Sequence, residues 1–361
     1  MLKNLFRNIT LVLLSFVFVF LMLEGILRIL PVSEGLRTQE VDKISPIAHF
    51  QPNRTSTWSR FPNFAMSNIV HSNNYGFIND QNYVVSDPRP LTAIIGDSYI
   101  EAAMVPYKQT VHGKLAKELE ANWRIYSFGV SGAPLSQYLK FAAFAQKTFH
   151  PQKMIFNIVA NDFDESLLKF KSDPGFHYFD LQSDNSLKLT RIDYTPSALK
   201  KLLRQSRLAM YLVMNLQIQN TINRFFMQPQ KLKYIGQTPS SAGQERLYLS
   251  RQAVDTFFKL LPDHTGLPPK DILIVLDGLR PSLYTPKGRH EAKGSYAAKM
   301  MDYIKNTAHH NQYTVIDLSN IFISDFQNNA HKFEFERDGH WNGYAHGIVA
   351  KTLLNMKDFW Q

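Results

Sequence analysis

The 361-residue chain contains no cysteine, which excludes a disulfide framework and a thiolate that acts as nucleophile or zinc ligand. Internal repeats and low-complexity tracts are absent as well. Hydrophobic residues make up 44% of the chain and aromatic residues 13%, enough to bury a full core and too many for a largely disordered protein. We therefore expect one large domain, or one domain with an appendage.

The longest hydrophobic stretch lies at the amino terminus. Residues 9–30 are mostly Leu, Val, Phe and Ile, and as a helix of roughly 33 Å they match the hydrocarbon layer of a bilayer. Lys3 and Arg7 precede the stretch, so the positive-inside rule places the amino terminus in the cytoplasm. We expect residues 1–31 to form a cytoplasmic tip and an uncleaved single-pass anchor in the cytoplasmic (inner) membrane, with the rest of the chain on the periplasmic or extracellular side.

Two other interpretations of this stretch compete with an anchor. A cleaved signal peptide needs small residues at its cleavage site, and residues 30–34 offer no Ala-x-Ala pattern. A buried core helix is rarely this long and this apolar at a terminus. Glu24 and Arg28 are the charged residues within the stretch, and they stand one turn apart, so they can pair at the far membrane interface.

Acidic residues are missing between Ser197 and Tyr234, in a chain of formal net charge +10. The basic residues of this segment are Lys200, Lys201, Arg204, Arg207, Arg224, Lys231 and Lys233. Apolar residues between them follow a broadly helical spacing, which suits contact of residues 197–234 with an anionic membrane surface or an anionic polymer. The alternative is a helical segment that packs on its own domain with a solvated basic face. Nucleic acid does not fit a domain outside the membrane.

Apolar strands and helices alternate from Leu91 onward, after a lead-in at 32–90 that we expect to be irregular and to pack on the core. The expected strands are 91–95, 123–128, 153–159, 271–276 and 313–317. The expected helices are near 110–120, 135–149, 246–261, 292–309 and 344–356. Strands separated by helices of this length predict a parallel α/β sheet with helices on both faces over 91–361. An inserted basic helical region is expected at about 165–245.

A short apolar run at 91–95 leads directly into Gly96-Asp97-Ser98. Ligands bind at the carboxyl ends of strands in α/β sheets, so Ser98 is the first candidate nucleophile. Gly-Asp-Ser alone is a common tripeptide that also suits a plain turn. Other polar groups follow expected strands or precede the closing helix: Gly132, Asn161, Asp338 and His340.

Acyl transfer through a serine requires a base, a group that orients the base, and donors for the developing oxyanion. His340 can act as the base of Ser98. Asp338 lies two positions earlier, so its carboxylate can fold back to one imidazole nitrogen and fix the tautomer. The backbone N–H groups of Ser98 and Gly132 and the side-chain amide of Asn161 can supply three oxyanion donors.

Each of these residues also has a structural interpretation. His340 can serve as a structural cap, Asn161 can form an Asx turn at a strand end, and Gly132 can serve only a positive φ. Glu336 competes with Asp338 for the orienting role.

Other polar residues are interpreted without a catalytic role. His346, on the closing helix, is more often a packing residue than a second base. Asp97 and Asp162 are expected to hydrogen-bond neighbouring loops. His309 and His310 have no accompanying carboxylate or thiolate cluster, so no metal site is predicted.

In order, spacing and strand context, these blocks resemble those of the SGNH, or GDSL-type, hydrolase family over about residues 91–356. The resemblance implies a flavodoxin-like three-layer α/β/α fold and a serine esterase or acyltransferase without a cofactor. The catalytic residues that it implies are Ser98, His340 and Asp338. The oxyanion donors that it implies are Ser98, Gly132 and Asn161.

The chain departs from the family's usual sequence blocks at two places, and these departures narrow the branch of the family that it resembles. Val159 stands where the family's third block usually has glycine, and Asp338-Gly339-His340 is one residue shorter than the usual last block. The shorter block followed by Trp341 is similar to the signature of cell-envelope SGNH proteins related to polysaccharide O-acetyltransferases. The resemblance thus implies an acyl ester, of acetate in particular, on an envelope glycan or glycoconjugate. The alternatives are a non-catalytic glycan-binding or scaffold protein of an envelope assembly and a lipid esterase.

Overall fold

A five-stranded parallel sheet forms the centre of the computed structural model, which describes residues 2–219, 234–235 and 238–361. The strands are β3 (Leu91–Gly96), β4 (Arg124–Gly129), β5 (Lys153–Ile158), β10 (Ile272–Leu276) and β11 (Thr314–Asp317). Their spatial order is β11-β10-β5-β3-β4, with every neighbouring pair parallel. Numbered along the chain, this is the 2-1-3-4-5 order of flavodoxin-like sheets, so the predicted fold class is confirmed.

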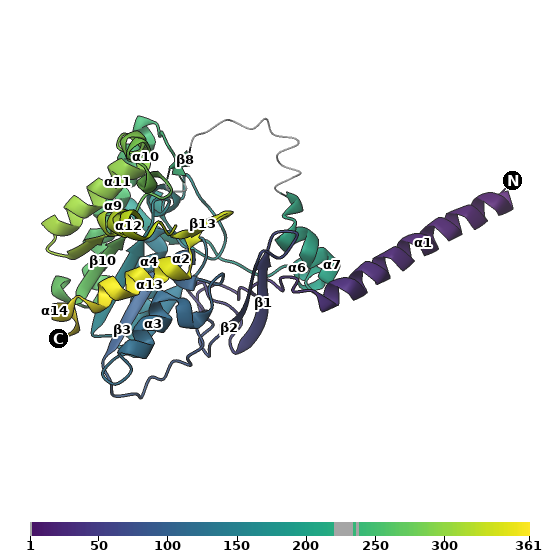
Figure 1. Ribbon diagram of the computed structural model, residues 1–361, viewed down its shortest axis with the longest axis horizontal. Helices are drawn as coiled ribbons and strands as arrows, with labels where there is room; N and C mark the ends of the chain where they lie inside the picture. Colours follow the sequence, from purple (N-terminus) through teal and green to yellow (C-terminus); the bar gives the residue numbers. More distant parts are fainter. Residues whose placement is uncertain (1, 220–233, 236–237) are drawn as a thin grey trace.

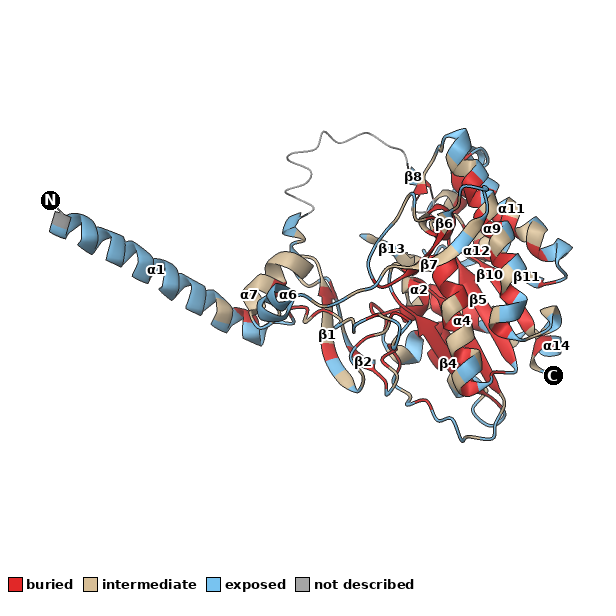
Figure 2. Cartoon of the chain, turned by 180° about the vertical axis from the view of Figure 1, so that it is seen from behind, coloured by how far each residue is buried: buried red, intermediate tan, exposed pale blue. Residues whose placement is uncertain are grey.

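Helices cover both faces of the sheet (Figure 1). Those that contribute to the larger core are α4 (Leu135–Phe149), α9 (Gln244–Thr265) and α11 (Tyr296–His310). Those on the opposite face are α3 (Val111–Glu118), α12 (Leu318–Asn329) and α13 (Gly343–Leu354). The sheet between them is buried, as the colouring of Figure 2 shows. Successive residues of β10 alternate between the two cores, which explains why its sequence is apolar throughout.

The sequence prediction missed α12. Its sequence is rich in Asn, Ser and β-branched Ile, which favour helices weakly, so periodicity alone gave no signal. The helix begins because the side chain of Asp317 accepts a hydrogen bond from the Ser319 N–H at 3.0 Å. The helix expected at 292–309 is present as α11, and a separate short helix that was not predicted, α10 (Pro286–Ala292), precedes it.

The lead-in at 32–90 contains more regular structure than predicted. An antiparallel hairpin, β1 (Arg54–Arg60) and β2 (Met66–Ser72), lies within it. Its strands are rich in Ser, Thr and Asn, so no hydrophobic run marks them, although Val70 of β2 contributes to the larger core. Shorter elements complete the α/β core around the strand ends. They are α2 (Ser98–Glu101), η1 (Tyr107–Gln109), α5 (Asp162–Glu165), η3 (Pro269–Asp271), η4 (Ser282–Tyr284), β12 (Glu334–Phe335), β13 (Asp338–Trp341) and α14 (Lys357–Trp360).

The region at 165–245, expected to be helical, begins instead with the hairpin β6 (His177–Leu181) and β7 (Leu187–Arg191). Helical structure starts only after it, in α6 (Ala198–Leu203), α7 (Arg207–Met210) and η2 (Tyr211–Asn215). Two short strands follow, β8 (Tyr234–Ile235) and β9 (Thr238–Pro239). Arg224, Lys231 and Lys233 lie outside the described residues.

Helix α1 (Leu2–Ile29) extends away from the α/β domain (Figure 1). Its segment Lys3–Ile29 is long and apolar enough to cross a membrane, and its apolar window is not buried against the rest of the chain. A signal sequence at the amino terminus would have the same length and composition.

The carboxyl end of α1 is joined to α7 by the side chain of Glu24. The carboxylate accepts hydrogen bonds from the backbone N–H groups of Arg207 and Leu208, both at 3.0 Å, and from the Ser206 hydroxyl at 2.9 Å. It also pairs with Arg28 at 2.9 Å, so the predicted pairing of Glu24 with Arg28 is present. Because the first N–H groups of a helix lack internal partners, Glu24 satisfies the amino terminus of α7 from another element. A small apolar cluster seals the joint, formed by Leu27, Val32 and Met210.

The end of β4 approaches α2 so closely that only glycine fits at position 129. A Cβ atom there would lie 2.6 Å from the Glu101 nitrogen and 2.9 Å from the Asp97 oxygen, both backbone atoms. Gly129→Ala is therefore expected to lower the free energy of unfolding by about 1–3 kcal/mol, measured by urea denaturation. Gly294→Ala is the matched control, because nothing lies within 4 Å of its added Cβ. Equal stability of the two variants would show that the close approach imposes no constraint.

Candidate active site

Ser98 lies at the first position of α2, directly after the sharp turn that ends β3. Asp97 caps this helix, since its Oδ1 accepts the Tyr99 N–H at 2.9 Å. Burial raises the pKa of Asp97 to about 6. The tight turn and the cap fix the direction of the Ser98 side chain at the carboxyl edge of the sheet.

The structure brings Ser98, His340 and Asp338 together in one hydrogen-bonded chain. Nε2 of His340 lies 2.7 Å from the Ser98 Oγ, and Nδ1 of the same ring contacts Oδ1 of Asp338. The backbone N–H of His340 donates to this Oδ1 at 3.0 Å as well. Glu336, the other candidate for orienting the imidazole, is exposed in the turn between β12 and β13. The carboxylate at position 338 therefore holds the ring.

Asp338 is kept ionised by its surroundings. Burial would raise its pKa, but hydrogen bonds from the His340 side chain and backbone, together with the charges of His340 and Arg60, hold the pKa well below its usual range. Arg60 reaches Asp338 from β1 and forms an ion pair with Oδ2. Sequence reasoning missed Arg60 because it lies 278 residues from Asp338, within a segment expected to be irregular.

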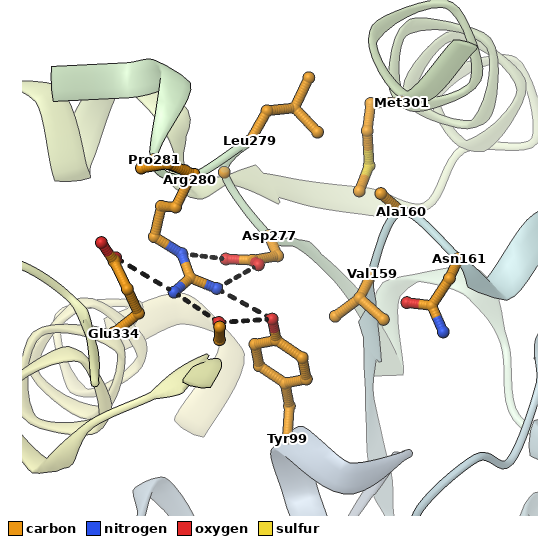
Figure 3. Close-up of a pocket in the computed structure, with 12 residues that line it drawn as sticks. Tyr99, Val159, Ala160, Asn161, Asp277, Leu279, Arg280, Pro281, Met301 and Glu334 are labelled. Carbon is orange, nitrogen blue, oxygen red and sulfur yellow. Dashed lines mark hydrogen bonds and ion pairs between the residues drawn. The ribbon is translucent and has the colours of Figure 1, made fainter. Parts of the chain in front are cut away.

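A buried cluster of side chains clamps the backbone of the loop that carries His340 (Figure 3). The carbonyl oxygen of Gly339 accepts hydrogen bonds from Arg280 at 3.1 Å and from the Tyr99 hydroxyl at 3.0 Å. Arg280 is paired with Asp277 at 2.6 Å, and the Trp341 indole N–H donates to Asp277 at 2.9 Å. Asp277 directly follows β10, so its place at a strand end was the sequence signal for this cluster.

The proposed oxyanion donors lie on three neighbouring strand ends. Gly132 occupies the turn after β4 with φ +81°, and neither its N–H nor that of Ser98 donates a hydrogen bond to another described residue. Asn161 follows β5, and its Oδ1 is buried without a hydrogen-bond partner among the described residues. It lines a small cavity of about 40 Å³ with Tyr99 and Val159, beside the clamp (Figure 3). All three groups follow neighbouring strands at one edge of the sheet, but Gly132 and Asn161 are not among the residues that line the cleft of Ser98 and His340.

The cleft above Ser98 and His340 has a volume of about 260 Å³. Part of its wall comes from segments outside the α/β core: Trp58 and Arg60 from β1, and Met214 from η2 of the inserted region. These walls were not predicted, because single-sequence patterns do not show which surface segments meet over a sheet edge.

Glu101 is a further acidic group of the cleft that sequence reasoning missed. Its side chain is buried and accepts the Ser131 N–H at 2.5 Å. Burial raises the pKa of Glu101 to about 7, although the hydrogen bonds from Ser131 oppose the shift. Its position three residues after Ser98, one turn further along α2, was the available signal.

The remaining polar residues have structural roles. Asp162 accepts the Val159 N–H at 2.8 Å and the Tyr138 hydroxyl at 3.0 Å. His346 is buried, its Nδ1 accepts the Val111 N–H at 3.2 Å, and its ring packs edge-on against Trp341.

His309 and His310 end α11. Among the described residues, no group of three or more His, Asp or Glu side chains could hold a metal ion.

Comparison with protein-family models finds no match, and no curated protein matches. Solved structures similar to this chain include a member of the lipolytic protein G-D-S-L family from Veillonella parvula, 13% identical, covering 74% of this chain and 97% of that one with a TM-score of 0.37. A lipase/acylhydrolase from Enterococcus faecalis is 10% identical, covering 74% and 95% with a TM-score of 0.39. The acetyl xylan esterase AlAXEase is 10% identical, covering 73% and 98% with a TM-score of 0.37. At these values the likeness concerns the fold alone.

The buried carboxyl of Glu101 makes stability depend on pH. Its folded pKa of about 7 exceeds the usual 4.5, so the protonated form favours folding and this contribution is lost as pH rises from about 4.5 through 7. Glu101→Gln cannot ionise. Its stability relative to the wild type is therefore expected to increase between pH 5 and pH 8, by on the order of 3 kcal/mol, in denaturant titrations at each pH. Glu118→Gln, on the exposed face of α3, is the control, and a pH-independent difference for Glu101→Gln would contradict the assignment.

Proposed function

We propose that this chain is an SGNH-type serine esterase or O-acyltransferase, anchored in the cytoplasmic membrane by α1, that acts on an acyl ester of an envelope glycan or glycoconjugate. The observation that carries the proposal is the hydrogen-bonded chain from Ser98 through His340 to Asp338, with 2.7 Å between Oγ and Nε2. This is the arrangement in which a base within hydrogen-bond reach activates a serine.

In the proposed reaction, the Ser98 Oγ attacks the ester carbonyl carbon while Nε2 of His340 takes the hydroxyl proton. Asp338 stabilises the resulting imidazolium, and the N–H groups of Ser98 and Gly132 with the amide of Asn161 receive the oxyanion. The ester C–O bond then breaks, and His340 returns the proton to the leaving alcohol. Water completes hydrolysis by attacking the acyl-enzyme, and a sugar hydroxyl in its place completes transfer, with His340 again accepting the proton.

The shortened last block does not keep His340 from Ser98. The loop 338–341 is a strand of the small β12–β13 pair, and the clamp on Gly339 directs the imidazole toward Oγ. The alternative suggested by Val159 and by this spacing is a non-catalytic glycan-binding or scaffold protein. Such a protein would not require the contact between His340 and Ser98.

The charges around α1 support an outward placement of the catalytic domain. Lys3 and Arg7 lie at its amino-terminal end, and positive charges remain on the cytoplasmic side of membrane helices. Outside the membrane, the domain meets the glycans of the envelope.

Ser98→Ala is expected to abolish hydrolysis of p-nitrophenyl acetate and covalent labelling by a fluorophosphonate probe, because no other group would form the acyl-enzyme. Ser186→Ala, in the exposed β6–β7 turn, is the matched control and should keep both. Wild-type hydrolysis by purified Ser98→Ala would refute the mechanism.

Asn161→Ala tests the oxyanion hole. Loss of one donor typically lowers kcat by about 10²–10³, so this variant should be slow but still labelled by the probe. An unchanged kcat in steady-state assays would remove Asn161 from the site.

A further inference from the structure

A second cavity, of about 540 Å³, lies between the lead-in and the inserted region. Its lining is mostly apolar and includes Leu36, Phe50, Val130, Phe176, Leu203 and Met210. A volume of this size is typical of sites that enclose a small molecule. Sugars need hydrogen-bond partners around the ring, so the apolar lining suits a hydrocarbon chain better than a glycan.

This apolar cavity adjoins the catalytic cleft. The residues that line both are Trp58, Glu101, Ser131, Val213 and Met214. Glu101 is three residues from Ser98 on α2, so the shared wall stands next to the nucleophile. A substrate whose ester lies at the Ser98 Oγ can therefore extend an attached chain into the cavity.

The other end of the apolar cavity is formed by α6 and α7, next to the end of α1. Lys200 and Arg204 line it there, and no acidic residue lies on α6 or α7. Leu199 and Leu202 of α6 are each 63% exposed. Figure 1 shows α6 and α7 beside the carboxyl end of α1, to which Glu24 joins α7. Exposed leucines among basic residues fit the surface of an anionic bilayer.

We propose that the apolar cavity holds the fatty-acyl chain of a membrane-lipid ester, with the ester carbonyl at Ser98 and the chain running back past α6 toward the bilayer. This inference rests on the proposed function in its transfer form: the acyl donor is a long-chain lipid ester, the hydroxyl of the envelope glycan is the acceptor, and water in its place gives hydrolysis. The acyl group leaves the lipid alcohol for the Ser98 Oγ by the steps given above. Lys200 and Arg204 rest on anionic headgroups at the rim and hold the cavity mouth against the membrane.

The first test is a chain-length series of p-nitrophenyl esters with the full chain in detergent. Each buried methylene favours binding by up to about fourfold, so kcat/KM is expected to rise from acetate to octanoate by at least about 30-fold. Ser98-dependent hydrolysis that does not rise with chain length overturns the inference and leaves the proposed function standing.

Ala209→Phe places a bulky side chain in the apolar cavity away from the catalytic cleft. The octanoate-to-acetate ratio of kcat/KM is expected to fall at least about tenfold. Leu202→Phe, on the exposed face of α6, is the matched control and should keep the wild-type ratio. An unchanged ratio in Ala209→Phe contradicts an acyl chain in this cavity.

A binding measurement decides the question without catalysis. Brominated dodecanoate is expected to quench tryptophan fluorescence of the Ser98→Ala protein through Trp58, which lines the apolar cavity. The quenching should disappear in the Trp58→Phe and Ala209→Phe forms of that protein. If the wild type hydrolyses no ester, the proposed function fails, and quenching at Trp58 still supports the cavity as a lipid-chain site. Absence of quenching in the Ser98→Ala protein overturns the inference that the cavity holds a lipid chain.

Vesicles of phosphatidylglycerol and phosphatidylcholine test whether the cavity mouth at Lys200 and Arg204 faces the membrane. Release of fatty acid from phosphatidylglycerol vesicles is expected to fall at least about fivefold in Lys200→Glu/Arg204→Glu, because each basic residue near an anionic surface adds to attraction. Lys117→Glu/Lys351→Glu, with the same charge change on exposed positions of α3 and α13 away from the cavity, is the control. Equal loss in both variants, or no loss in either, contradicts a membrane-facing mouth at Lys200 and Arg204.

Discussion

The buried ion pair between Asp277 and Arg280 holds the geometry of the site. Their side chains are only 8% and 3% exposed, so neither charge is solvated and each depends on the other. Arg280 also donates to the Gly339 carbonyl and to the Tyr99 hydroxyl, and Asp277 accepts the indole N–H of Trp341. The residues on both sides of His340 are thus fixed by groups at the end of β10. The loop 338–341 can present the imidazole because its backbone is held by these buried groups.

Part of the wall around Ser98 comes from segments outside the sheet and the helices that cover it. Hairpin β1–β2 supplies Trp58 and Arg60, and η2 supplies Met214. A buried network connects these parts, since Asn215 donates to the Ser59 hydroxyl at 2.9 Å and Ser59 donates to the Pro31 carbonyl at 2.6 Å. Strand β1, which this network joins to the segment directly after α1, therefore also carries the guanidinium that pairs with Asp338.

Residues at strand ends were predictable from the sequence, and the groups that enclose them were not. Ser98 and Asn161 were predicted because each follows an apolar strand, and the edge of a parallel sheet collects such residues whatever their separation along the chain. Asp277 follows β10 in the same way but was not among the predicted residues. Arg60 has no comparable signal, because strand β1 is polar and meets Asp338 only through tertiary packing. Helix α12 shows the same limit, since its weak propensity is overridden by the core around Phe322.

The joint between α1 and α7 fixes how α1 meets the α/β domain. Glu24 satisfies the backbone of α7, and Leu27 packs beneath it, so the helix passes into the domain without a free hinge. With α1 in the bilayer, as proposed, Ser98 would stay at a fixed height above the lipid surface, whereas a flexible linker would let that height vary. Its search for substrate would then be two-dimensional, by lateral diffusion of enzyme and lipid, and an acceptor deeper in the envelope would have to come down to the membrane to be modified.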